Sequence, residues 1–341
     1  MIYKDVELYN VEELLPTSDG GALSMTRIPN ELRESLNDSA KLAALYPAGG
    51  EVRFNLQGDS AAVTLRAEGG PSVVEVFRGP FLFSWQVVKP GETRVEVGQL
   101  QSVEALQTIS REHNLPFDPG LVRVILPYAH PVQLVGIEGQ TSPPDASQVP
   151  RRRILAYGSS ITHGSSAVRP TGTYAMRLAQ SLGVDLINLG FGGGAHCEPQ
   201  LADYIASRSD WDLATLELGI NMVYRPEFTV EEFKRRVEYF VSRIVEAHPD
   251  KWVFCTDMFT FAADLGANPA RNAEFRRVVR EVVRKIGSPR LVHLDGRRLL
   301  RSIPGLSVDL VHPSPRGMEE IAYRFSRIIL RNIRSEPSEP A

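Results

Sequence analysis

Apolar and polar residues alternate in short runs over the first part of the chain. Between residues 51 and 139 these runs are rich in β-branched and aromatic residues, and Gly, Pro, Asp or Ser separates them. Such a pattern predicts the strands of an antiparallel β-sandwich. In residues 29–47 and 100–113 the apolar positions instead recur at helical spacing, so we expect two helical interruptions there.

From residue 153 onward, near-continuous apolar runs alternate with amphipathic segments. The apolar runs are RILAYG, DLINLG, LATLELG, WVFCTDM and RLVHLDG. Strands of this kind between amphipathic helices are typical of a parallel sheet with helices on both faces. A Ser- and Pro-rich segment, residues 139–153, separates the two patterns. We therefore expect an all-β, jelly-roll-like sandwich over 1–140, a linker over 141–152, an α/β domain over 153–335 and a disordered tail over 336–341.

Composition excludes several classes of function. The chain has 341 residues, enough for two domains, and its net charge of −3 gives no sign of the basic excess that nucleic acid or an anionic membrane would require. The start lacks a signal-peptide pattern and no apolar run reaches the ~18 residues of a membrane helix, so we expect a cytoplasmic protein. Cys197 and Cys255 have no partners at metal-site spacing and are expected to be buried. The oligomeric state is not predicted.

Four loops that follow predicted strands carry residues suited to acyl transfer. Ligands of parallel α/β sheets bind at the carboxyl ends of the strands. A serine there needs a base, and the base needs a group that holds its tautomer. Ser160 can supply the nucleophile, His312 the base and Asp309 the orienting carboxylate. The Ser160 amide, a glycine amide of GFGGG and the Asn221 side chain can stabilise the oxyanion.

The sequences YGSSIT, NLGFGGG, LGIN and DLVH resemble, in this order, the four blocks of the SGNH or GDSL hydrolases. The resemblance covers residues 153–333 and implies a flavodoxin-like domain with a five-stranded parallel sheet. It also implies a serine esterase that needs no cofactor or metal. Its residues would be Ser160 as nucleophile, Asp309 and His312 as the other catalytic residues, and Ser160, Gly193 and Asn221 as the oxyanion-binding residues.

Two positions depart from the family pattern. Ser159 replaces the aspartate that usually precedes the nucleophile, and Met222 replaces the aspartate that usually follows the third-block asparagine. With its N-terminal β-domain, the chain resembles a two-domain branch that includes sugar-deacetylating esterases. It also resembles a salicylyl acyltransferase of tetracycline biosynthesis.

The resemblance implies a small-molecule partner and leaves the acceptor open. We expect hydrolysis of short acyl esters on a sugar or another small molecule. The alternative is transfer from an acyl ester or thioester, such as acyl-CoA, to an alcohol or sugar hydroxyl of a glycosylated natural product. An alternative of a different class is a carbohydrate-binding protein with an inactive site. No nucleic-acid or membrane partner is expected.

Several motifs have simpler interpretations. Ser160 could be only a helix cap, and Ser159 competes with it at the same turn. Gly190, Gly192 and Ala195 satisfy the loose dinucleotide pattern G-x-G-x-x-A, although close backbone packing explains glycines equally well. We expect His163, His196 and Glu217 to be structural. We expect the alternating aromatic residues Phe81, Phe83 and Trp85 to face a core, with a sugar-stacking platform as the lesser alternative. Arg169 and Tyr174 could line the substrate pocket.

Overall fold

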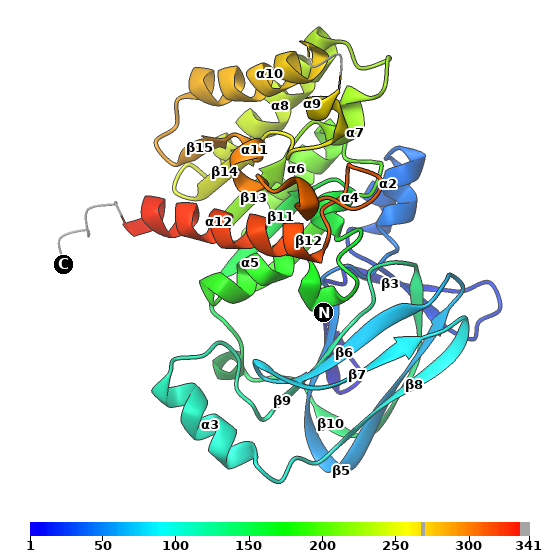
Figure 1. Cartoon of the computed structure of the whole chain (residues 1–341). Helices are drawn as coiled ribbons and strands as arrows, with labels where there is room; N and C mark the ends of the chain where they lie inside the picture. Colours follow the sequence, from blue (N-terminus) through cyan, green and yellow to red (C-terminus); the bar gives the residue numbers. More distant parts are fainter. Residues whose placement is uncertain (267–269, 335–341) are drawn as a thin grey trace.

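A computed structural model describes residues 1–266 and 270–334. It has two sheets, an antiparallel one at the N-terminal side and a parallel one at the C-terminal side (Figure 1). The predicted tail, 336–341, lies outside the described residues. No helix in the described residues is long and apolar enough to cross a bilayer.

The antiparallel sheet contains ten strands and bends around the long strand β5. Residues 51–53 of β5 pair with β2 and residues 51–55 with β9, whereas residues 60–66 pair with β8. Both halves bury side chains in one apolar core, Phe54 from the first and Val63 from the second. The predicted sandwich is therefore one continuous sheet folded on itself. Its strands are β1 (Ile2–Tyr3), β2 (Val6–Tyr9), β3 (Glu13–Pro16), β4 (Leu23–Thr26), β5 (Glu51–Ala67), β6 (Ser72–Arg78), β7 (Phe81–Val88), β8 (Gly91–Gly98), β9 (Leu121–Ile125) and β10 (Val132–Ser142).

The five-stranded parallel sheet is confirmed, with the strand order β12-β11-β13-β14-β15. Its strands are almost wholly buried, as near-continuous apolar runs require. Helices α6, α8 and α10 pack in one core cluster, and helices α5 and α12 pack in the other. The strands are β11 (Arg153–Gly158), β12 (Asp185–Gly190), β13 (Leu213–Glu217), β14 (Trp252–Thr256) and β15 (Leu291–Leu294). The long helices are α5 (Tyr174–Leu182), α6 (Pro199–Ser207), α8 (Val230–Ala247), α10 (Ala270–Ile286) and α12 (Pro315–Arg334), and the short ones are α4 (Ser160–His163), α7 (Ile220–Val223), α9 (Ala262–Leu265) and α11 (Gly296–Leu299).

Both helical interruptions of the N-terminal part are confirmed. Helices α1 (Asn30–Glu34) and α2 (Asp38–Ala43) form the first, and α3 (Val103–Glu112) forms the second. Side chains of the first interruption, Leu36 and Ala40 among them, pack into the same core cluster as α6, α8 and α10. The N-terminal sequence thus completes part of the C-terminal core. The domain bounds at 140 and 153 stay predictions.

A buried ion cluster joins the two sheets. Arg53 on β5 donates two hydrogen bonds, of 2.7 and 2.8 Å, to the carboxylate of Asp185 at the start of β12. Arg53 also pairs with Glu51, which Arg123 contacts in turn. The Arg53 guanidinium lies 3.7 Å from the centre of the Tyr9 ring. Buried charges need such pairing, so this cluster fixes how the two sheets meet.

The aromatic residues of β7 do not face a core, so that expectation is wrong. Phe83 is 39% exposed and Trp85 is 62% exposed. Strand β7 ends the sheet path, and most of its residues on both faces are half-buried or exposed.

Candidate active site

The turn after β11 brings Ser160 to the carboxyl edge of the parallel sheet. Strand β11 ends at Gly158, and Ser159 caps helix α4 by accepting a hydrogen bond from the Ile161 amide at 3.1 Å. A Cβ atom on Gly158 would lie 2.2 Å from Thr162 Oγ1. Only glycine fits this position, because the backbone here passes against buried side chains.

Ser160, His312 and Asp309 form a continuous chain of contacts. Ser160 Oγ lies 2.7 Å from His312 Nε2, and His312 Nδ1 lies 2.7 Å from Asp309 Oδ2. Ser160 and His312 are half-buried and Asp309 is exposed, so solvent reaches this chain of contacts. The structure therefore brings together the three residues that the sequence singled out, across 152 positions of separation.

Asp309 is fixed by the loop that carries it. Its Oδ1 atom accepts hydrogen bonds from the amides of Val311 and His312, each at 2.9 Å, and from Ser307 Oγ at 2.8 Å. Burial raises the pKa of Asp309, but the hydrogen bonds from His312, Val311 and Ser307 outweigh burial and hold its pKa well below the usual range. The loop therefore fixes the position of the Asp309 side chain and favours its ionised form.

The glycine loop after β12 packs beside Ser160. A Cβ atom on Gly192 would lie 3.7 Å from Ser160 Cβ, and Gly193 has a φ of +71°. A Cβ atom on Gly194 would lie 2.4 Å from the Ala40 amide of α2. Asn221, on α7, accepts a hydrogen bond from the Ala195 amide through Oδ1 at 3.2 Å. This contact fixes the orientation of the Asn221 amide and leaves its NH₂ group free to donate elsewhere.

Sequence reasoning missed Arg27, which holds the glycine loop in place. Its buried guanidinium donates to the carbonyls of Asn188 and Gly190, both at 2.8 Å. It also donates to the carbonyls of Ala43, at 2.6 Å, and Tyr46, at 2.7 Å. Burial lowers the pKa of Arg27 to about 9. No local pattern indicates this role, because the contacts with Asn188 and Gly190 span more than 150 residues.

Glu217 lies beneath the turn and accounts for Ser159. Glu217 Oε2 accepts hydrogen bonds from the Ser159 amide at 2.7 Å and from Ser159 Oγ at 2.6 Å. Thr162 Oγ1 donates to the same oxygen at 3.2 Å and lies 2.6 Å from the Tyr174 hydroxyl. Burial raises the pKa of Glu217, although the hydrogen bonds from Ser159 and Thr162 oppose it. The Ser159 hydroxyl is thus engaged and 99% buried, whereas Ser160 faces His312.

The other residues considered from sequence lie around this site. His163 is buried, with Nε2 2.8 Å from the Tyr128 carbonyl and Nδ1 3.1 Å from the Gly190 carbonyl. Burial, helped by the charge of Arg27, lowers the pKa of His163 to about 4. Buried His196 packs on Phe228, with ring centres 4.9 Å apart.

Arg169 and Tyr174, which we expected to be able to line the substrate pocket, do not line the cavity beside the Ser160 turn. Tyr174 is buried beneath the nucleophile turn, where it contacts Thr162. Arg169 instead lines a different cavity, between the two sheets, where it lies 3.6 Å from Glu75.

A cavity of about 320 Å³ adjoins the Ser160 turn. Gly192 and His163 line it from the parallel-sheet side. Its remaining walls come mainly from N-terminal residues, Leu42, Tyr46 and Tyr128 among them. The N-terminal part of the chain therefore contributes directly to the surroundings of the site.

Packing explains Gly190, the first glycine of the dinucleotide pattern. A Cβ atom on Gly190 would lie 2.2 Å from the His163 amide, and Arg27 occupies the Gly190 carbonyl. The described residues contain no group of three or more His, Cys, Asp or Glu side chains placed to hold a metal ion.

One known family matches the C-terminal part of the chain. Residues 156–320 match the GDSL-like Lipase/Acylhydrolase family. This part of the chain is therefore similar to the GDSL-like hydrolases. No curated protein matches the chain. The match to this family supports an enzyme of the SGNH type, as the resemblance predicted.

Solved structures of the same two-part architecture match nearly the whole chain. The salicylyl-acyltransferase SsfX3 from a tetracycline biosynthetic pathway is 21% identical, with a TM-score of 0.77, over 98% of this chain and 97% of that one. A family two carbohydrate esterase from Cellvibrio japonicus is 15% identical, with a TM-score of 0.63, over 97% and 96%. One from Clostridium thermocellum is 18% identical, with a TM-score of 0.58, over 84% and 93%. At these identities the likeness is one of fold.

Proposed function

We propose that this enzyme is a serine acyl-ester hydrolase that removes short acyl groups from a sugar or another small molecule through an acyl-enzyme on Ser160. The observation that carries the proposal is the pair of 2.7 Å contacts linking Ser160 Oγ to His312 and His312 to Asp309. The match to the GDSL-like family supports the reaction class.

The contacts define the first half-reaction. The Nδ1–H of His312 donates to the Asp309 carboxylate, so Nε2 carries the lone pair and accepts the Ser160 proton. Ser160 Oγ attacks the carbonyl carbon of the ester while His312 takes the proton. When the C–O bond of the tetrahedral intermediate breaks, His312 returns the proton to the leaving alcohol, which leaves an acyl-enzyme.

Backbone amides and Asn221 stabilise the oxyanion in this scheme. The Ser160 amide lies at the start of helix α4, and the Gly193 amide belongs to the loop that packs beside Ser160. The NH₂ group of Asn221 is the third donor, because its oxygen already accepts from Ala195. In the second half-reaction water attacks the acyl-enzyme with His312 as base, and the freed acid leaves Ser160 restored.

The second candidate is an acyltransferase in which an alcohol replaces water. The structural likeness to a salicylyl-acyltransferase over 98% of this chain favours it. The likeness to carbohydrate esterases favours hydrolysis in the same way. Both reactions use Ser160, His312 and Asp309 identically, so the acceptor distinguishes them.

Product analysis tests the two candidates. The protein is incubated with p-nitrophenyl acetate, with acetylated sugars, and with acyl-CoA plus candidate alcohols. Release of free acid faster than formation of a new ester supports the hydrolase. Acyl transfer that outpaces hydrolysis overturns it in favour of the transferase. The Ser160→Ala variant is the control for enzyme-independent hydrolysis.

A further inference from the structure

The C-terminal helices carry a basic excess that the net charge hides. Residues 270–334 contain 15 Arg and Lys but six Asp and Glu, whereas the whole chain has a net charge of −3. Many of these arginines gather on the α10, α11 and α12 side of the parallel sheet, where they line two adjoining cavities. Like charges in a cluster repel one another unless anions neutralise them, so the free charge of the cluster depends on which guanidinium groups have an anionic partner.

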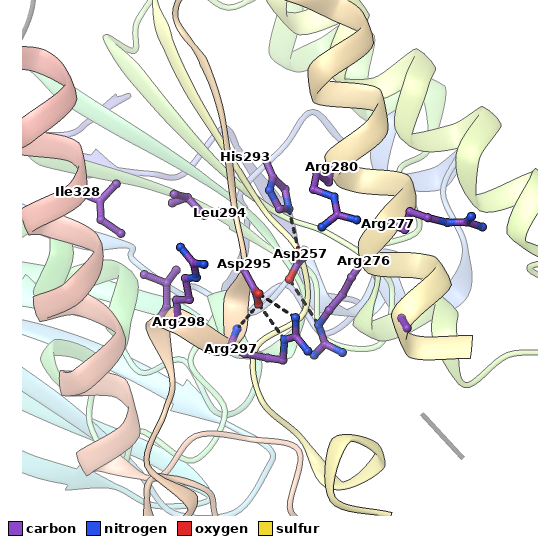
Figure 2. Close-up of a pocket in the computed structure, with 12 residues that line it drawn as sticks. Asp257, Arg276, Arg277, Arg280, His293, Leu294, Asp295, Arg297, Arg298 and Ile328 are labelled. Carbon is purple, nitrogen blue, oxygen red and sulfur yellow. Dashed lines mark hydrogen bonds and ion pairs between the residues drawn. The ribbon is translucent and has the colours of Figure 1, made fainter. Parts of the chain in front are cut away.

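The first cavity, of about 440 Å³, lies beside the edge strand β15. Figure 2 shows Arg276, Arg277 and Arg280 entering from α10 and Arg297 and Arg298 from α11. Arg297 is neutralised by two contacts with the Asp295 carboxylate, at 3.0 and 2.8 Å. Arg276 pairs with Asp264 at 2.6 Å and is buried. The charges of these two arginines are therefore balanced by carboxylates of the cavity wall.

Arg280 and Arg298 have no such neutralisation. Both are exposed, and within residues 1–266 and 270–334 no hydrogen bond or ion pair engages either guanidinium. Arg277 has only a distant contact, 3.9 Å from Glu281. Asp257, the other carboxylate of this wall, is buried against His293. The cavity therefore presents free positive charge.

A second cavity, of about 490 Å³, continues the first. It shares Arg298 and Ile328 with it and is otherwise lined by Arg301, Tyr323 and, on α12, Arg324, Arg327 and Arg331. No carboxylate lines this cavity. Arg324 pairs with Glu320 at 3.0 Å, and Arg327 donates to the Tyr323 hydroxyl at 2.8 Å. The two cavities together present a row of guanidinium groups, which we call the arginine strip. Its members are Arg276, Arg277, Arg280, Arg297, Arg298, Arg301, Arg324, Arg327 and Arg331.

We propose that the arginine strip binds a small ligand that carries a diphosphate or several phosphate groups. A guanidinium presents a planar fork of N–H donors that matches phosphate oxygens two at a time. Two joined cavities of a few hundred Å³ suit a small molecule, whereas a flat basic face would suit a membrane or a duplex. Leu294 and Leu299 in the first cavity add an apolar floor on which a non-phosphate part of the ligand can pack.

The arginine strip is separate from Ser160, and one end of it lies near the same edge of the sheet. Ser160 follows the carboxyl end of β11, and Asp295 follows the carboxyl end of β15. Strands β13 and β14 lie between β11 and β15, so three steps of about 4.8 Å separate the ends of these two strands by roughly 14 Å. The rest of the arginine strip lies along α10 and α12. Two sources of the phosphate chemistry fit this placement: a free nucleotide, and a coenzyme A thioester whose phosphates bind here while its acyl end extends toward Ser160.

Calorimetric titration tests the proposal with pyrophosphate, ADP and coenzyme A as probes on the full-length protein. The test variant is Arg280→Gln with Arg298→Gln. The matched control is Arg284→Gln with Arg316→Gln, which removes the same charge from exposed positions of α10 and α12 that line neither cavity. Thermal unfolding of both variants verifies that they fold. The binding readout does not depend on Ser160, so a failure of the arginine strip is distinct from a failure of the proposed hydrolase.

We expect ADP or coenzyme A to bind, with affinity at least about tenfold weaker in the test variant than in the control. Tighter binding of coenzyme A than of ADP favours the coenzyme as the ligand, and the reverse favours a free nucleotide. The proposal is overturned if none of the three probes binds at millimolar concentration. It is equally overturned if test and control variants bind alike, or if a DNA oligonucleotide or anionic vesicles bind and the small probes do not.

Discussion

Two Asp–His pairs lie at the carboxyl edge of the same parallel sheet, and they differ in almost every physical respect. His312 Nδ1 lies 2.7 Å from Asp309, and His293 Nε2 lies 2.8 Å from Asp257. The Asp309 carboxylate is 47% exposed, whereas that of Asp257 is 2% exposed. The first pair spans a three-residue turn, and the second joins the neighbouring strands β14 and β15.

The two carboxyl groups respond to their surroundings in opposite directions. Hydrogen bonds outweigh burial at Asp309 and hold its pKa below the usual range. At Asp257, burial outweighs the hydrogen bonds from His293 and Gly296 and raises the pKa. Only the imidazole of His312 has a serine hydroxyl at its other nitrogen. An Asp–His pair alone therefore does not indicate catalysis, and the atom at the far nitrogen decides what the pair can do.

Loss of the serine hydroxyl gives the largest expected effect. Ser160→Ala lowers kcat for p-nitrophenyl acetate by roughly 10⁶, because triad residues act as a unit. Ser159→Ala is the matched control and removes a hydrogen bond to Glu217 and a helix cap, at a cost of about 1 kcal/mol of stability. Steady-state kinetics compares the two. A larger loss of kcat in Ser159→Ala would reverse the assignment of the nucleophile.

Amide substitution of each aspartate tests the two pairs directly. Asp309→Asn lowers kcat by roughly 10⁴, because the amide no longer holds the His312 tautomer that leaves Nε2 unprotonated. Asp257→Asn lowers kcat far less, since His293 has no contact with Ser160. Equal losses of kcat in both variants would mean that the contrast between the pairs has no catalytic meaning.

Removal of one oxyanion donor gives a smaller change, confined to the Ser160 site. Asn221→Ala lowers kcat by roughly 10²–10³ with little change in KM, because the donor acts mainly in the transition state. The matched control is Asn272→Ala, a buried asparagine on α10. An unchanged kcat in Asn221→Ala would remove this residue from the oxyanion site.

The dependence of stability on pH gives the smallest effect. Because the pKa of Asp309 is lowered, its contribution is present at neutral pH and is lost as pH falls below about 4, so wild type and Asp309→Asn converge in acid. Because the pKa of Asp257 is raised, its ionisation costs stability as pH rises above about 4, so Asp257→Asn gains on wild type over that range. Urea unfolding over a pH series measures both differences. The same sign for both would contradict the contrast.

Features that depend on local order could be predicted from the sequence. Four motifs in order, each at a strand end, placed a serine turn, Asn221 and His312 at the edge where parallel strands end, and the family resemblance then chose Ser160 over Ser159. The spacing of Asp309 and His312 is local, so a turn can join them. The parallel sheet follows from apolar runs between amphipathic helices.

Features that depend on distant contacts could not be predicted. Arg27 holds a loop more than 150 residues away, and helix α2 packs into the core of the C-terminal part. The pairing of Asp257 with His293 depends on the register of two strands. The basic excess of residues 270–334 is visible in the sequence, but which of its guanidinium groups lack an anionic partner depends on how α10, α11 and α12 pack. In each case the spatial neighbours are unrelated in sequence position.

Covalent labelling with a fluorophosphonate tests the central claim most directly. The reagent phosphonylates an activated serine, and mass spectrometry of the digested protein locates the adduct. The account predicts a single adduct on Ser160 that is absent in Ser160→Ala and strongly reduced in His312→Ala. An adduct on Ser159, or labelling of Ser160 that persists undiminished in His312→Ala, would contradict it.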